Sequence, residues 1–294
     1  MIDDGYTSIH NAARCGDGIP AGARRPRVML ERLPFLRFAP TTQSIFMASK
    51  APKNSQPSAA TAPATAPAEG ERRALRGYVG QYERAGAAIY AALERDELLW
   101  IGVADRNAGI ADDLVLGFDG LVVGHQFKTS KFPGTFTVET LFTGANGLLK
   151  PLVQAWQCLS KDNPGSRVEI HLVVNDFPSV TDKPGDGRLR HSAAFLEEFQ
   201  QHPNRSLSDW SARGWSRLID HLRREAGLND DDFEQFMHAL RVVCGAAANF
   251  IQSHKLNAEQ ARQACEIASV LPKLVADERD KDRWTRDELL HELG

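Results

Sequence analysis

A hairpin-forming stretch near the middle of the chain constrains its fold more than any other feature. Residues 112–128 read DDLVLGFDGLVVGHQFK, with Asp119-Gly120 between two apolar runs. An Asp-Gly pair in this setting is typical of a two-residue turn that joins antiparallel strands. The sequence therefore predicts two paired strands, near 113–118 and 121–128.

Polar side chains at the open end of this hairpin form a candidate site. Side chains two apart on a strand share a face, so Gln126 and Lys128 are expected to point the same way and Phe127 the opposite way. Asp113 opens the paired strand, where its carboxylate can meet both side chains. A carboxylate, an amide oxygen and an ammonium in one place suit a divalent cation and a phosphate group. The combination suggests metal-assisted cleavage of a phosphodiester.

Length and composition leave the broad class open but exclude several alternatives. The chain has 294 residues and a formal net charge of -3, which allows one large domain or two modest ones. This charge is no global signature of nucleic-acid binding, so basic residues would have to act locally. The four cysteines form no CxxC pair, which argues against a disulfide framework or a zinc site. No apolar run is long enough to cross a membrane, and a cytoplasmic protein is expected.

The first 70 residues differ in composition from the rest. Residues 48–70 form a tract of Ala, Pro, Thr and Ser, which cannot bury enough apolar surface to fold. We therefore expect residues 1–70 to be disordered or to form a linker. Met47 precedes this tract, so translation could begin there, and the sequence leaves open whether residues 1–46 exist in the cell.

Periodicity predicts a compact α/β region over residues 71–180, followed by an all-helical module over 181–294. The expected order in the first region is α-β-β-β-α-β, with these elements besides the hairpin: a helix at 75–94, a strand at 98–104, an extended segment at 135–142, a helix at 147–159 and a core strand at 167–174. In the second region we expect helices near 191–201, 208–226, 230–252 and 257–278, and a last one capped by Thr285. Asn229 before three aspartates is a further helix-start signal.

The order of elements and the residues of the hairpin resemble the PD-(D/E)xK nucleases, whose core is the restriction-endonuclease-like fold. The family pattern is an acid at the start of one strand and Glu, Asp or Gln-x-Lys on the next, here Asp113 and Gln126-x-Lys128. Gln in place of Glu is usual in the Mrr-like branch. The resemblance covers about residues 72–176. It includes Gly77-Tyr78-Val-Gly-Gln81, which is similar to the first helix of nuclease domains at the N-terminus of bacterial anti-phage proteins of the NACHT and STAND type.

This resemblance implies a Mg²⁺-dependent endonuclease that cuts double-stranded DNA in bacterial anti-phage defence. Asp113 and Gln126 would be the metal ligands, and Lys128 would orient the attacking water or stabilise charge on the phosphate. Three further side chains are secondary candidates for the site, and two lysines are candidates for binding DNA phosphates: Gln81, Glu83 and Asp112, then Lys131 and Lys150. The chain has no G-x-x-x-x-G-K-[ST] motif. An NTPase or sensor would therefore come from a partner or from a missing C-terminal domain, and homo-oligomerisation stays open.

Two other classes of function remain open. Gln126 removes one negative charge from the site, so the domain could be a weak or inactive nuclease fold that binds DNA or a protein partner. Alternatively, the helical half could carry the function as an interaction module. A nucleotide-binding enzyme is disfavoured because no Gly-rich phosphate loop follows a strand. In the plainer interpretation of the hairpin, Lys128 is a solvated edge lysine and His125 is a packed core histidine.

Overall fold

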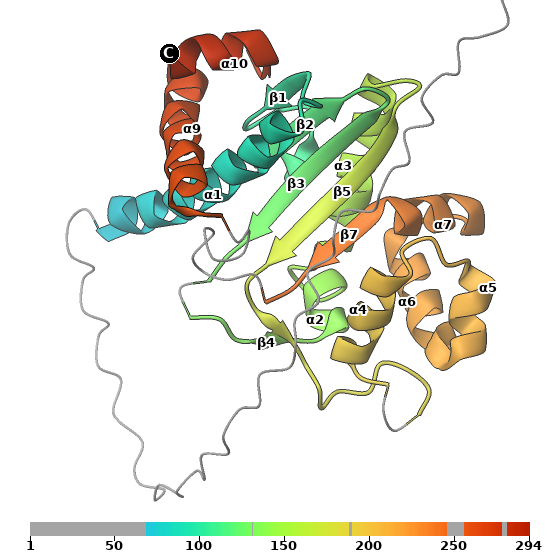
Figure 1. The fold of residues 1–294 in the computed structure, drawn as a ribbon. Coiled ribbons are helices and arrows are strands. Elements are labelled where there is room, and N and C mark those ends of the chain that lie inside the picture. Colours follow the sequence, from blue (N-terminus) through green and yellow to red (C-terminus); the bar gives the residue numbers. More distant parts are fainter. Residues whose placement is uncertain (1–68, 131, 188–189, 246–255, 278–280) are drawn as a thin grey trace, which may run out of the picture. The chain divides into compact units, whose positions relative to one another are not determined.

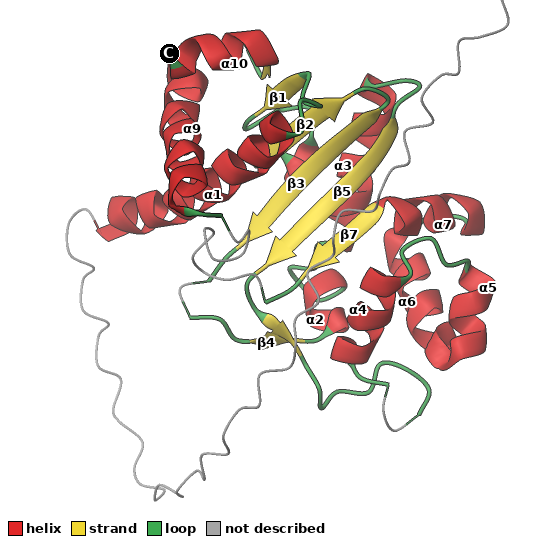
Figure 2. Ribbon diagram, in the orientation of Figure 1, coloured by secondary structure: helices red, strands yellow, loops and turns green. Residues whose placement is uncertain are grey.

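The protein has a mixed α/β fold, which is the class that the sequence predicts, and its main sheet has six strands. The computed structural model describes residues 69–130, 132–187, 190–245, 256–277 and 281–294, and residues 63–294 belong to one compact unit. The expected disordered segment 1–70 lies, except for its last two residues, outside the described residues. Helices cover both faces of the sheet (Figures 1 and 2).

The sheet is mixed, in the order β7-β5-β3-β2-β1-β8. The strands β3, β5 and β7 are parallel to one another, and the other neighbours are antiparallel. The bounds are β1 Trp100–Gly102, β2 Leu114–Phe118, β3 Leu121–Lys128, β5 Arg167–Val174, β7 Leu240–Val243 and β8 Arg283–Thr285. The hairpin prediction is confirmed: β2 pairs with β3 across Asp119-Gly120, and Gly120 has the positive φ of 67° that such a turn favours.

Each face of the sheet buries its own apolar cluster. On one face, α3 (Leu149–Asp162) packs on β3 and β5, and this core continues into the helices that follow β5. On the other face, α1 (Glu69–Glu94) and α9 (Ala258–Asp277) pack on β1, β2 and β3. The side chains of β5 alternate between the two faces: Val168, Ile170, Leu172 and Val174 face α3, and Arg167, Glu169 and His171 face the other side. Among the described residues, no helix is both long enough and apolar enough to span a bilayer.

The segment expected to be extended at 135–142 is largely helical. Only β4 (Thr135–Phe136) is a strand, paired with β6 (Phe177–Pro178), and α2 (Val138–Phe142) follows. Thr137 ends the extended part because its side chain accepts a hydrogen bond from the Thr140 amide. The Thr140 side chain reciprocates, which makes a capping box. This local cap outweighs the β propensity of the Thr and Phe residues.

The expectation that residues 181–294 are all helical is wrong at two places. Its helices are α4 Ser192–Gln201, α5 Leu207–Trp210, the π-helical turn η2 Ser211–Trp215, α6 Ser216–Ala226, α7 Asp230–Ala239, α9 and α10 Arg286–Leu293. The helix expected at 230–252 ends at Ala239, and β7 follows; residues 246–252 lie outside the described part. Leu240 and Val242 are buried in the core that contains α3, and pairing with β5 satisfies their backbone.

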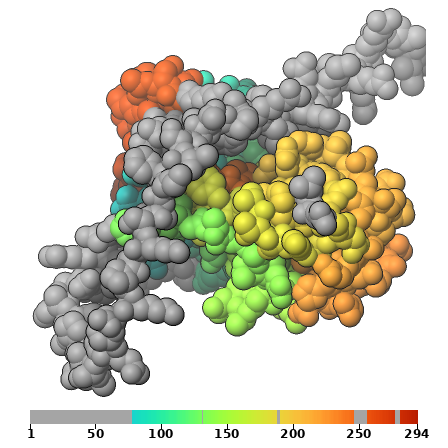
Figure 3. Space-filling view, turned by 90° about the horizontal axis from the view of Figure 1, so that it is seen from below, coloured from blue at the N-terminus to red at the C-terminus, as the bar shows by residue number. Residues whose placement is uncertain are grey.

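Both edge strands of the sheet therefore come from the C-terminal part of the chain. β7 extends the β5 edge, and β8 pairs with β1 at the opposite edge. Strands from both expected segments, 71–180 and 181–294, thus share one sheet. Figure 3 shows the surface of the segment that follows β5, in yellow, next to the orange helices that precede β7.

Candidate active site

Asp113 and Gln126 are brought into direct contact by the hairpin register. Leu114 pairs with His125, so the residue before β2 lies opposite Gln126. The Asp113 Oδ2 atom accepts a hydrogen bond of 2.7 Å from the Phe127 amide and another from Gln126 Nε2. Gln126 is buried, whereas Lys128 is exposed at the end of β3. The expected pairing of an acid with the Gln-x-Lys strand is therefore present in the geometry.

Burial raises the pKa of both aspartates at this site. Burial raises the pKa of Asp113 to about 6; the neighbouring Asp112 adds to this, while the Phe127 amide, the Lys128 ammonium and the Gln126 amide act in the opposite direction. The pKa of Asp112 is also raised, chiefly by burial, with a smaller contribution from Asp105, and Lys128 again lowers it. The Lys128 ammonium therefore acts on both carboxylates. Two acids and one cation form a single electrostatic group.

One side chain of the first helix that the sequence did not mark as a candidate feels the charge of this group. Tyr82 is half-buried, and its pKa is raised by burial, by Tyr78 and by the charge of Asp113. Within the described part of the chain, no hydrogen bond or ion pair joins Gln81 or Glu83 to the site. Tyr82 directly follows the Gly77-Tyr-x-x-Gln81 pattern, and nothing in the sequence distinguishes it from a core aromatic residue.

Of the two lysines expected to contact DNA, Lys150 is not part of the group. Lys150 is exposed in the first turn of α3, where its Nζ lies 4.0 Å from the Glu225 carboxylate of α6. Lys131 lies outside the described residues.

The donor atoms at the site fit a hard divalent cation. Asp113 and Asp112 offer carboxylate oxygens and Gln126 an amide oxygen, and Mg²⁺ in proteins commonly takes one or two carboxylates and completes its shell with water and substrate phosphate. Among the described residues, no three His, Cys, Asp or Glu side chains are grouped as a metal site. These candidate ligands therefore carry little negative charge, because Gln126 is neutral.

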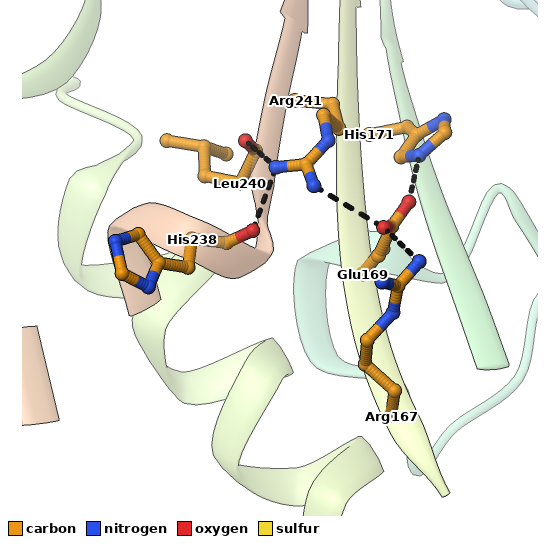
Figure 4. A network of polar contacts seen from close by, with 6 residues as sticks. All are labelled: Arg167, Glu169, His171, His238, Leu240 and Arg241. Carbon is orange, nitrogen blue, oxygen red and sulfur yellow. Dashed lines mark hydrogen bonds and ion pairs between the residues drawn. The ribbon is translucent and has the colours of Figure 1, made fainter. Parts of the chain in front are cut away.

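A second polar cluster, which was not predicted, joins β5 and β7 on the face of the sheet opposite to Gln126 (Figure 4). Glu169 of β5 accepts hydrogen bonds from Arg167 at 2.7 Å and from Arg241 of β7 at 3.2 Å, and its other carboxylate oxygen lies 3.1 Å from His171 Nε2. Burial alone would raise the pKa of Glu169. The His171 contact and the two arginines hold it below its usual value instead.

His125 lies beside this cluster and is buried, as predicted for a core histidine. Its ring centroid is 4.9 Å from that of His171 and 5.9 Å from that of Phe127. The carboxylate of Glu169 is thus matched by cations from two strands, and the cluster ties β5 to β7.

Comparison with known proteins does not assign the chain to a family. No family model matches it, and no significantly similar curated protein was found. Among solved structures, it is similar to the Cap4 SAVED/CARF-domain containing receptor of Acinetobacter baumannii with the cyclic trinucleotide 3'3'3'-cAAA. The TM-score is 0.36 and the identity 10%, over 71% of this chain and 45% of that chain. The chain thus spans less than half the length of this receptor.

Proposed function

We propose that this protein is a Mg²⁺-dependent endonuclease that hydrolyses double-stranded DNA. The observation that supports this most is the contact of the Asp113 carboxylate with the Gln126 amide, under the charge of Lys128. An acid followed by Gln-x-Lys on the paired strand is also the pattern on which the resemblance to PD-(D/E)xK nucleases rests. The setting that this resemblance implies is the bacterial cytoplasm, in defence against phage.

The roles of the side chains follow from their chemistry. Asp113 and Gln126 would hold the ion, with Asp112 as an additional carboxylate. When bound, Mg²⁺ polarises the scissile phosphate and lowers the pKa of a bound water. Lys128 would donate hydrogen bonds to phosphate oxygens and stabilise the charge that develops on them. Because the pKa of Asp113 is about 6, its carboxylate is ionised at neutral pH and available as a ligand.

The test is cutting of plasmid and linear double-stranded DNA, with Mg²⁺ or with EDTA. We expect wild-type cutting to need Mg²⁺ and to fall by roughly two orders of magnitude or more in Asp113→Ala and in Lys128→Ala. Lys161→Ala is the matched control, because Lys161 is exposed in the last turn of α3. Cutting that survives in both site variants, or that continues in EDTA, would exclude this site.

One observation favours a second function, a nuclease fold that binds DNA without cutting it. The Gln126 amide donates a hydrogen bond to Asp113, so the carboxylate has a partner without any cation. If this is the working state, wild-type protein shifts DNA in a gel but yields no Mg²⁺-dependent products. Binding of neither Mg²⁺ nor DNA would point instead to a role in protein interaction.

A further inference from the structure

The end of β3 is held by the residues that follow β5. Lys128 is the last residue of β3 and pairs in register with Val174, the last residue of β5. One more backbone hydrogen bond follows, from the Asn175 amide to the Lys128 carbonyl, at 3.2 Å. The chain then leaves β5 for β6, so its backbone no longer follows β3.

The side chain of Asn175 continues the ladder where the backbone stops. Its Oδ1 accepts a hydrogen bond from the Ser130 amide at 2.8 Å, and its Nδ2 donates one to the Ser130 carbonyl at 2.7 Å. A carboxamide has the same donor and acceptor as a peptide group, so this pair takes the place of one rung of the sheet. The side chain is buried, with 2% of the residue exposed, and both of its polar ends are used.

Asp176 also holds the segment that follows β3, through hydrogen bonds of its own. Its Oδ1 accepts hydrogen bonds from Ser130 Oγ at 2.9 Å and from the Gly134 amide at 2.8 Å. Its carbonyl accepts the amide of Gly245, which follows β7. Ser130 is thus bound through its backbone to Asn175 and through its side chain to Asp176.

We propose that Asn175 is a positioning residue for Lys128, an inference that rests on the proposed nuclease function. The backbone at Lys128 is fixed on both sides, upstream by the bond from Phe127 to Asp113 and downstream by the bonds from Ser130 to Asn175. The lysine side chain is exposed at the end of the strand, so the position of its backbone decides what its ammonium can reach. A displacement of about 1 Å at a reacting group can lower a rate roughly 100-fold.

The chemistry of the contact requires an asparagine. Aspartate has the same shape but lacks the donor, and it would place a carboxylate against the Ser130 carbonyl oxygen. Asn175→Asp therefore removes one of the two bonds without changing the volume, and Asn175→Ala removes both. Asn163→Ala is the matched control, since Asn163 also bonds a backbone carbonyl, that of Leu159 at the end of α3.

The experiment measures kcat for plasmid cutting in Mg²⁺ and the Kd for DNA in Ca²⁺. We expect both Asn175 variants to lower kcat roughly 10- to 100-fold while Kd stays within about twofold, and the control to change neither. In a double-mutant cycle with Lys128→Arg, the loss caused by Asn175→Ala should shrink, because the two residues act through one group. Full kcat in both variants, or strictly additive losses, would overturn the proposal.

Amide hydrogen exchange separates this inference from the nuclease proposal. Asn175→Ala should speed exchange at the Ser130 amide and leave the β2 amides unchanged, whether or not the protein cuts DNA. If wild type does not cut but exchange rises at Ser130, the nuclease proposal fails while the hold on β3 stands. If wild type cuts and exchange at Ser130 does not change, the positioning role fails while the nuclease proposal stands.

Discussion

Asp113 combines burial with a proposed role, as a metal ligand, that needs charge. Burial raises its pKa to about 6, against about 3.9 for an aspartate in an unfolded chain. Between these two values the folded protein binds more protons than the unfolded chain. The contribution of Asp113 to stability therefore falls as the pH rises through this window and becomes constant above about pH 6.

Asp113→Asn should make the protein more stable at pH 8 while abolishing cutting. Asparagine stays neutral, and its oxygen can still accept the hydrogen bonds from the Phe127 amide and Gln126. Thermal unfolding in EDTA should show a higher Tm for the variant at pH 8 and a smaller gain at pH 5, where Asp113 is largely protonated. Asp119→Asn is the control, because Asn-Gly suits the same turn. An equal or lower Tm for Asp113→Asn at pH 8 would contradict the prediction.

The contact between α1 and α9 depends on a glycine in the middle of a helix. A Cβ atom on Gly86 would lie 2.4 Å from the Ala264 carbonyl oxygen and 2.8 Å from the Ala268 Cβ. The two helices are close there because small residues face each other, and they cover the same face of the sheet. Helix propensity alone would favour alanine at this position, so tertiary packing decides the residue.

Gly86→Ala should therefore destabilise the protein, by about 1–3 kcal/mol, because the new methyl group meets backbone. Gly80→Ala is the matched control in the same helix, since nothing lies within 4 Å of the added atom. That variant should gain up to about 1 kcal/mol from helix propensity alone. Urea denaturation shows whether each variant has a higher or a lower free energy of unfolding than the wild type. A stabilising Gly86→Ala would show that α9 does not pack on α1 as described.

The strand β7 is bound to β5 by charge as well as by backbone pairing. Glu169→Gln should lower the free energy of unfolding at pH 7 by about 1–3 kcal/mol, because Arg241 and Arg167 lose their carboxylate partner. The folded pKa of Glu169 is lowered, so this stabilisation is present above the unfolded pKa and is lost as the pH falls through the folded one. The denaturation midpoints of the variant and the wild type should therefore differ less at pH 3 than at pH 7. An exposed acid, in Glu97→Gln, serves as the control.

The last residues of the described chain complete the sheet and bind the loop that follows β1. Arg283 of β8 donates a hydrogen bond of 2.8 Å to Asp105, which is fully buried, and its guanidinium lies 4.5 Å from the ring centroid of Trp100. Asp105 in turn contributes to the raised pKa of Asp112. The C-terminal strand thus supports the loop that leads into the acidic pair.

Trp284→Ala should lower the free energy of unfolding by about 3–5 kcal/mol, because the ring is almost fully buried in the apolar cluster that α1 and α9 share with the sheet. Leu290→Ala in α10 is the control. Leu290 is exposed, so its loss should cost less than about 0.5 kcal/mol. Urea denaturation followed by circular dichroism compares the two. Similar losses for both variants would mean that β8 is not an integral strand of the sheet.

Elements whose signals are local can be predicted from the amino-acid sequence alone. Asp119-Gly120 specifies the hairpin, and the β2–β3 register then places Asp113 beside Gln126, only 13 residues further along the chain. The caps work in the same way: the side chain of Asn229 begins α7 and that of Thr285 begins α10, as predicted. Short-range turns and caps depend on the chemistry of a few neighbouring residues, so the sequence alone reveals them.

Which distant segments meet depends on tertiary packing. A four-residue segment such as β7, which is apolar except for Arg241, suits a helix or a strand equally well, and the free edge of β5 with its Glu169 made it a strand. The same holds for β8 beside β1, for Gly86 under α9, and for the Asn175 amide that extends the ladder at Ser130. Each of these depends on burial and hydrogen bonds between residues far apart in sequence, which leave no periodic pattern in the chain.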